Sequence, residues 1–211
     1  MEHPKQKNYQ QAFDLACALL KEKGLKERAE KAGAGYEKNR EGEEILITFF
    51  SEIYTIHSPL MEFLCPGKKT VSLVVRVLLL HYLLHADGNP LTAKWVAYKD
   101  LPGGLLYAGV FARRVTEPLV KKYGKSAKSF REAGTRFKGE TAGVGDASFY
   151  LQAFPRVPLQ YVLWEGDDEF PPSVQLLFDS SVVHYLPLED VVVLGQITTG
   201  RLISLSNRLS P

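Results

Sequence analysis

The feature that most constrains this chain is an apolar stretch that runs from residue 71 to residue 84. It falls short of the roughly 20 apolar residues that a membrane-spanning helix needs, and Arg76 and His81 interrupt it. Thr70, a residue type that caps helices, precedes the stretch, and an Asp-Gly-Asn-Pro sequence that ends helices follows it. The stretch therefore predicts a helix over residues 70–86 that is apolar almost all round and buried at the centre of the fold.

The rest of the chain contains both helical and strand patterns. Apolar residues at positions 13, 16 or 17, and 20 recur at helical spacing and predict a helix over residues 7–23. Stretches that alternate or are rich in β-branched and aromatic residues predict strands. The expected strands are residues 44–50, 52–57, 94–99, 147–154 and 159–164, and the further helices are residues 105–123, 126–133 and 187–205.

These elements predict an α+β fold. We expect a single antiparallel or mixed sheet of about four or five strands, packed by the central helix and the C-terminal helix. The charge-rich stretch over residues 25–44 contains several glycines and is typical of a short helix followed by a linker. We therefore expect residues 1–43 to form an N-terminal helical arm with its linker, and residues 44–211 to form the main domain.

Charge is unevenly distributed, although the whole chain carries a net charge of only +2. Residues 93–139 hold eleven basic and three acidic residues, a net charge of +8, whereas residues 140–211 hold three basic and nine acidic residues, a net charge of −6. Such segments can attract each other in the fold, or the basic one can bind an anion. Nucleic-acid binding through residues 113–138 is an alternative, but a general nucleic-acid binder is usually more basic overall.

The densest group of candidate functional residues follows the strand predicted at residues 159–164. The chain turns at Gly166 after this strand, and three acids follow on the loop. Carboxylates at a strand end can ligate a hard cation, hold an amine or transfer a proton. An aspartate and a histidine farther along lie close enough in sequence to complete a set of oxygen and nitrogen ligands. The candidate ligand-binding residues are Trp164, Asp167, Asp168, Glu169, Asp179 and His184.

This loop fits three roles. We predict a non-catalytic binding or accessory protein that holds a small molecule, a metal or a protein partner there, because loops that combine aromatic and acidic residues are common binding sites. One alternative is an enzyme that uses the loop carboxylates as acid and base. The other is an acidic turn with a purely structural role. The sequence identifies neither a catalytic residue nor a cofactor.

The same loop carries a resemblance to a known family. The sequence Trp-Glu-Gly-Asp-Asp-Glu-Phe-Pro at residues 164–171, followed by Leu-Phe-Asp at 177–179, resembles the signature of an uncharacterised prokaryotic domain family. Residues 81–84 and 100–104 are similar to that family as well, so the resemblance covers residues 45–205. It implies a setting in the metabolism of anaerobic bacteria or archaea, and an added iron–sulfur module in some members. It implies no activity.

Two histidines and two cysteines are candidate metal ligands. His81 and His85 lie four residues apart on one face of the predicted central helix, a spacing that helical metal sites use. No third ligand is evident, and histidines in a last helical turn can simply satisfy its terminal carbonyls. Cys17 and Cys65 cannot supply the four thiolates that an iron–sulfur cluster usually takes, so we expect no such cluster in this chain.

Weaker signals concern anions and location. Gly103 and Gly104 precede a predicted helix, and with Arg113 and Arg114 they are the best candidates to hold an anion. No export signal follows the first residues, and the few cysteines suit a reducing compartment, so we expect a cytoplasmic protein that is not bound to a membrane. The expected partner is a small molecule or a protein, and a second copy of the chain is one candidate.

Overall fold

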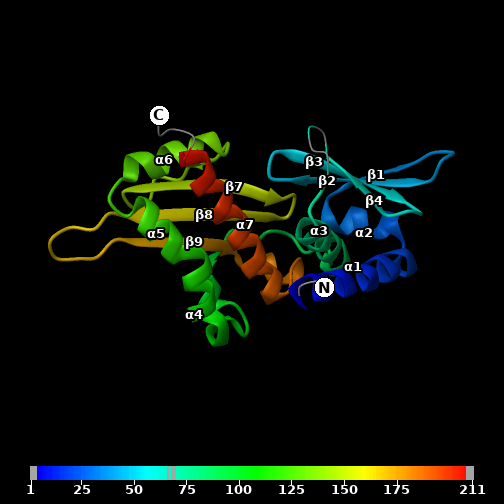
Figure 1. Ribbon diagram of the computed structural model, residues 1–211, viewed down its shortest axis with the longest axis horizontal. Coiled ribbons are helices and arrows are strands. Elements are labelled where there is room, and N and C mark those ends of the chain that lie inside the picture. The colour runs from blue at the N-terminus through cyan, green and yellow to red at the C-terminus, as the bar shows by residue number, and fades with distance from the viewer. Residues whose placement is uncertain (1–3, 66, 68–69, 208–211) are drawn as a thin grey trace. The chain divides into compact units, whose positions relative to one another are not determined.

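The computed structural model describes residues 4–65, 67 and 70–207, and it confirms the α+β fold class. The described residues form two antiparallel sheets, one of four strands and one of five (Figure 1). The chain divides into two compact units. The first runs to Pro90 and includes residues 153–156 and 184–187, and the second contains residues 91–152, 157–183 and those from 188 onward.

The first unit contains three helices among its described residues and the four-stranded sheet. The helices α1 (Pro4–Lys23) and α2 (Leu25–Ala32) pack against α3 (Leu73–His85). Each strand pairs antiparallel with the next, and one face of the sheet contributes Ile45, Ile47 and Ile56 to the core. The strands, in the order of the sheet, are β1 (Gly35–Lys38), β2 (Glu43–Phe49), β3 (Glu52–Ser58) and β4 (Glu62–Leu64).

Helix α3 is the buried central helix of this unit, as its apolar circumference predicted. Leu79, Leu80 and Tyr82 have no exposed surface. The helix begins at Leu73, three residues after the predicted cap. Its last carbonyl groups would lack partners inside the helix, but the buried guanidinium of Arg28 donates hydrogen bonds to two of them, each 3.2 Å long.

The second unit is built on the five-stranded sheet. Its strands, in the order of the sheet, are β5 (Trp95–Ala97), β9 (Ser173–Asp179), β8 (Val157–Trp164), β7 (Ala147–Phe154) and β6 (Glu140–Thr141). Short 3-10 helices η1 (Tyr98–Asp100) and η4 (Ser180–His184) follow β5 and β9. The other helical elements are η2 (Gly104–Tyr107), α4 (Ala108–Phe111), the π-helical turn η3 (Ala112–Thr116), α5 (Glu117–Tyr123), α6 (Ala127–Arg136) and α7 (Leu188–Asn207).

Helices cover one face of this second sheet. Helix α5 contacts β9, α6 contacts β8, and α7 packs against both helices (Figure 1). Phe130 of α6 lies 5.0 Å from Phe149 of β7, measured between ring centroids, so the even-numbered residues of β7 face away from the helices. The backbone carbonyl of Val115, in the π-helical turn, accepts a hydrogen bond from the hydroxyl of Thr199 of α7, 3.2 Å away.

The expectation of a single sheet was wrong. Residues 173–179 form a strand that the sequence analysis missed, and this strand joins β5 to β8. The strands predicted at residues 44–57 instead pair with the short β1 and β4, and local hairpins close them into a separate sheet. The boundary predicted after residue 43 stays a prediction; it falls at the first residue of β2, Glu43.

No helix in the described part of the chain is both long and apolar enough to cross a membrane.

Candidate functional site

The loop from Trp164 to Pro171 is an exposed turn between β8 and β9. Asp167 shapes it, because its Oδ1 accepts hydrogen bonds from the backbone N–H groups of Phe170, 2.6 Å away, and Glu169, 2.9 Å away. These two bonds lower the pKa of Asp167 below its ordinary value. Asp168 and Glu169 are exposed. Asp167 therefore shapes the turn, and Asp168 and Glu169 face solvent. The fourth acid of the loop, Glu165, accepts a hydrogen bond from the backbone N–H of Ala127, 2.5 Å away.

Asp179 lies at the end of β9, where only 2% of its surface is exposed. Its Oδ1 accepts hydrogen bonds from the backbone N–H groups of Thr92, at 3.0 Å, and Ser181, at 2.9 Å, and from the Thr92 hydroxyl, at 2.9 Å. Its Oδ2 accepts one from the N–H of Ala93, at 2.7 Å. Burial alone would raise the pKa of Asp179, but the hydrogen bonds from Ser181 and Thr92 lower it to about 2.

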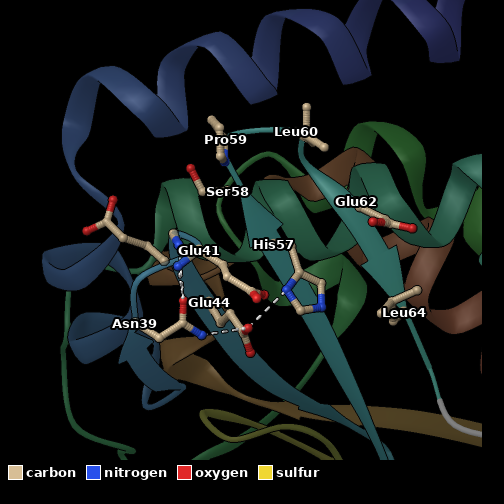
Figure 2. Close-up of a pocket in the computed structure, with 11 residues that line it drawn as sticks. Asn39, Glu41, Glu44, His57, Ser58, Pro59, Leu60, Glu62 and Leu64 are labelled. Carbon is tan, nitrogen blue, oxygen red and sulfur yellow. Dashed lines mark hydrogen bonds and ion pairs between the residues drawn. The ribbon is translucent and has the colours of Figure 1, made fainter.

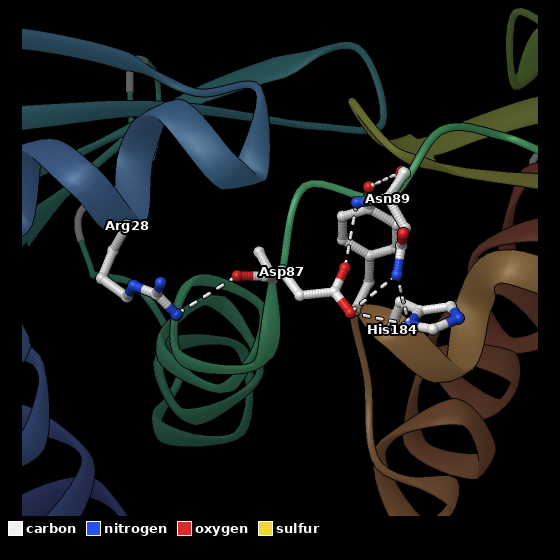
Figure 3. Close-up of polar contacts among 6 residues, drawn as sticks. Arg28, Asp87, Asn89 and His184 are labelled. Carbon is white, nitrogen blue, oxygen red and sulfur yellow. Dashed lines mark hydrogen bonds and ion pairs between the residues drawn. The ribbon is translucent and has the colours of Figure 1, made fainter.

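His184 has a different set of partners, all in the first unit (Figure 3). Its Nδ1 lies 2.7 Å from the carboxylate of Asp87 and 2.7 Å from the side-chain nitrogen of Asn89. Partial burial raises the pKa of Asp87, but hydrogen bonds from Asn89 and His184 lower it overall. The structure therefore does not bring the predicted residues to one site, since the loop acids, Asp179 and His184 each have their own partners.

The predicted anion-binding residues also separate. The backbone N–H of Gly104 donates to the carbonyl of Leu101, 2.8 Å away, and a Cβ at Gly104 would lie 1.9 Å from the carbonyl oxygen of Tyr98. Gly103 has a φ of +79°, a conformation that favours glycine. The two glycines thus form a tight turn, while Arg113 and Arg114 are exposed on η3, farther along the helical stretch.

The other candidate metal ligands are the two histidines of α3 and the two cysteines. The rings of His81 and His85 lie 6.2 Å apart on α3. Cys17 is half-buried and Cys65 is buried, neither is in a disulfide with a described residue, and burial raises the pKa of Cys17. Within the described ranges, no group of three or more histidine, cysteine, aspartate or glutamate residues has the arrangement of a metal site.

Two pockets remain as candidate sites. The first, of about 350 Å³, lies on the four-stranded sheet of the first unit (Figure 2). Glu44, His57 and Glu62 stand side by side on three neighbouring strands, and His57 Nδ1 lies 3.1 Å from the Glu44 carboxylate. No lysine or arginine is among the lining residues. This pocket can attract a cation, but its wall is mainly a row of solvated acids.

The second pocket, of about 420 Å³, lies on the face of the five-stranded sheet that the helices leave open. We call it the Trp95–Tyr150 pocket, after the two aromatic side chains on its floor. Their ring centroids are 5.4 Å apart, their planes are inclined by 30°, and both side chains are half-buried. The remaining lining residues are Leu91, Ala93, Lys138, Glu140, Leu151, Gln152, Pro158 and Asp179.

The backbone around the Trp95–Tyr150 pocket is strained. Ala93 has a φ of +57° and Lys138 a φ of +60°, in the left-handed region that residues other than glycine rarely adopt. Such a conformation costs on the order of 1–3 kcal/mol and tends to occur at functional sites. Asp179 holds one of these positions directly, through its hydrogen bond to the N–H of Ala93. This carboxylate therefore positions the segment that leads into Trp95.

The sequence pattern identified Asp179 as a candidate residue, but it did not identify the aromatic pair. Trp95 and Tyr150 both lie in strands that the sequence predicted, so they were available as candidates. Their proximity depends on β9, which lies between β5 and β8 and was not recognised as a strand. For Tyr150 the signal was an aromatic residue on the more polar side of an alternating strand, between Ser148 and Gln152. The strand of Trp95 carries no such signal, since each of its sides has one lysine.

The family model described as Domain of unknown function (DUF3786) matches residues 24–201. The chain belongs to this family. The DUF3786 match begins at Gly24, so it includes α2 and β1 as well as both sheets, and it covers the Trp95–Tyr150 pocket and the loop at residues 164–171. No curated protein and no solved structure shows significant similarity to the chain.

Proposed function

We propose that this DUF3786 protein is a binding protein that holds a small, flat molecule with an anionic group in the Trp95–Tyr150 pocket. The observation that carries the proposal is the half-buried aromatic pair on the floor of a pocket with two strained backbone positions. Its volume, about 420 Å³, is within the range of roughly 300–1,000 Å³ that is typical of small-molecule sites.

The aromatic floor suits a flat ligand. A third ring between two parallel rings needs a separation of about 7 Å, and the centroids of Trp95 and Tyr150 are only 5.4 Å apart. The ligand therefore rests on the exposed ring faces and does not insert between them. Pro158 and Leu91 add apolar surface to the same pocket.

The rim supplies charge. Lys138 and Glu140 line the pocket and are exposed, and the structure shows neither side chain in an ion pair with another described residue. The Lys138 ammonium suits a carboxylate or phosphate group on the ligand. Glu140 suits an amine on the same molecule, if the ligand carries one.

The pocket supports binding better than catalysis. Asp179 is the one buried carboxylate among its lining residues, and its two oxygens already accept four hydrogen bonds. With a pKa of about 2 it stays ionised at neutral pH, whereas a general acid or base works best with a pKa near the working pH. Enzymatic use of the exposed loop carboxylates remains the alternative.

The test is a ligand-observed NMR screen of planar aromatic carboxylates and phosphates, with neutral aromatic alcohols of the same size beside them. We expect the anionic compounds to bind the wild type more tightly than the alcohols. Trp95→Ala should abolish binding. Lys138→Gln should lower the affinity for the anionic compounds and leave the affinity for the neutral alcohols unchanged. The matched control is Trp164→Ala, which should bind the same compounds with the affinity of the wild type. Equal binding by wild type and Trp95→Ala would refute the proposal.

A second candidate role belongs to the loop at residues 164–171, which the sequence predicted as a binding element. Phe170 is 67% exposed and Trp164 37% exposed, beside the solvent-facing Asp168 and Glu169. Exposed aromatic residues next to acids favour contact with a protein partner. The cytoplasmic location and the anaerobic setting implied by the family resemblance stay predictions.

A further inference from the structure

A second exposed apolar surface lies on the second unit, at the start of its helical stretch. Leu105, Leu106 and Tyr107 are consecutive residues of η2, and 74%, 86% and 50% of their respective surfaces are exposed. Isolated exposed apolar side chains are ordinary, but several together mark an interaction surface. These residues lie outside the Trp95–Tyr150 pocket.

Basic residues extend this surface along the helical stretch. Arg113 lies in the π-helical turn η3, seven residues after Leu106. Arg114 stands in the same relation to Tyr107, and both arginines are exposed. Glu117 is the one acid between residues 103 and 122. We call residues 105–107 with Arg113 and Arg114 the basic apolar patch.

The loop at residues 164–170 has the complementary character, and we call it the acidic aromatic loop. It exposes Phe170 and part of Trp164, and its solvent-facing acids are Asp168 and Glu169. Asp167, whose pKa is lowered by its hydrogen bonds, and Glu165 bring the number of acidic residues on this loop to four. The basic apolar patch and the acidic aromatic loop therefore carry opposite charges, and both expose apolar side chains that can pack together.

The two surfaces lie at opposite ends of one helical stretch. The basic apolar patch begins the stretch that runs from η2 to α5, and the acidic aromatic loop lies at its end, where the N–H of Gly166 donates to the carbonyl of Gly124 at 3.2 Å. Twenty residues of helix measure about 30 Å, so the surfaces do not meet within one chain. Figure 1 shows the same separation between α4 and the turn that joins β8 to β9.

We propose that the occupant of the basic apolar patch is the acidic aromatic loop of a second copy of this chain. When two such helical stretches lie antiparallel across a twofold axis, each patch faces the partner's loop, and the contact forms twice. Leu106 then packs against the partner's Phe170, while Arg113 and Arg114 face the partner's Asp168 and Glu169. This inference rests on the second candidate role above and is independent of the Trp95–Tyr150 pocket.

The test is sedimentation velocity over a range of protein and salt concentrations. We expect a dimer whose dissociation constant rises with salt, because exposed ion pairs are screened. The variants Arg113→Glu with Arg114→Glu, and Asp168→Lys with Glu169→Lys, should each raise the dissociation constant at least tenfold. Near-ultraviolet circular dichroism and the melting temperature check that each variant is folded, and Leu106→Gln tests the contact without changing charge.

The decisive step is to mix the two charge-reversal variants. Each pair of surfaces then regains opposite charges, so the mixture should form a heterodimer with close to wild-type affinity. A wild type that stays monomeric at all concentrations would overturn the inference, as would loss of dimer without recovery in the mixture or a dimer unaffected by any variant. None of these results bears on ligand binding at Trp95, so the two proposals fail separately.

Discussion

Asp179 illustrates how far a single residue type can be interpreted from sequence. Its closeness in sequence to the acidic loop and to His184 made it a candidate ligand, but its neighbours in space decide its role. Thr92, Ala93 and Ser181 surround the carboxylate with hydrogen-bond donors, so it anchors a backbone segment and is not open to a ligand. Thr92 and Ala93 are more than 80 residues away along the chain. No local pattern around residue 179 reveals them.

The first prediction concerns the pH dependence of this anchor. The pKa of Asp179 is about 2 when folded and about 3.9 when unfolded, so its charge stabilises the fold above pH 4, and this contribution disappears as the pH falls from 4 to 2. Asp179→Asn should lower the free energy of unfolding by about 2–3 kcal/mol at pH 7 and by much less near pH 2. Urea denaturation at both pH values measures this.

The exposed Asp168→Asn is the control and should leave the free energy of unfolding within about 0.5 kcal/mol of the wild type. If Asp179→Asn unfolds with the wild-type free energy at pH 7, the anchoring role is wrong.

A second residue-scale prediction concerns Lys138, which follows α6 with a φ of +60°. Glycine adopts this conformation without strain, so Lys138→Gly should raise the free energy of unfolding by about 0.5–1 kcal/mol. The same change removes the ammonium group and should weaken binding of a planar aromatic carboxylate. Lys138→Gln keeps the strain and should lose affinity without gaining stability. Thermal denaturation and calorimetric titration separate the two effects, and a less stable glycine variant would contradict them.

At the scale of elements, strong periodic patterns were predictable and short or edge elements were not. Helix α3 and the strands β2, β3, β7 and β8 lie close to their expected positions. Strand β1, of four residues, lies in a stretch whose charged, glycine-rich composition predicts a linker. Its pairing with β2 makes it a strand, and tertiary pairing of this kind overrides local propensity.

A prediction at this scale tests the central helix. Leu80 of α3 has no exposed surface, so Leu80→Asp buries an unpaired carboxylate and should prevent soluble folding. Leu15→Asp is the matched control, because Leu15 of α1 is 62% exposed and the change should be tolerated. Soluble yield and circular dichroism measure both. A Leu80→Asp protein that melts like the wild type would show that α3 does not form the core.

At the scale of the whole molecule, the α+β class followed from the sequence, but the number of sheets did not. The aromatic pair of the Trp95–Tyr150 pocket comes together only because β9 inserts between β5 and β8. Strand order is a long-range property that composition and periodicity do not contain. The candidate site was therefore predictable only in part: Asp179 lines the pocket, but the ring pair that gives the pocket its chemistry required the topology.

Trp95 and Trp164 are the only tryptophans in the chain, and this allows one direct measurement of the central claim. With nitrogen-15 in the indole rings, each tryptophan gives one N–H resonance, assigned by Trp95→Phe and Trp164→Phe. Titration with a planar aromatic carboxylate that binds should shift the Trp95 resonance and leave the Trp164 resonance in place. A shift confined to Trp164, or none in the presence of measured binding, would show that the ligand does not occupy the Trp95–Tyr150 pocket.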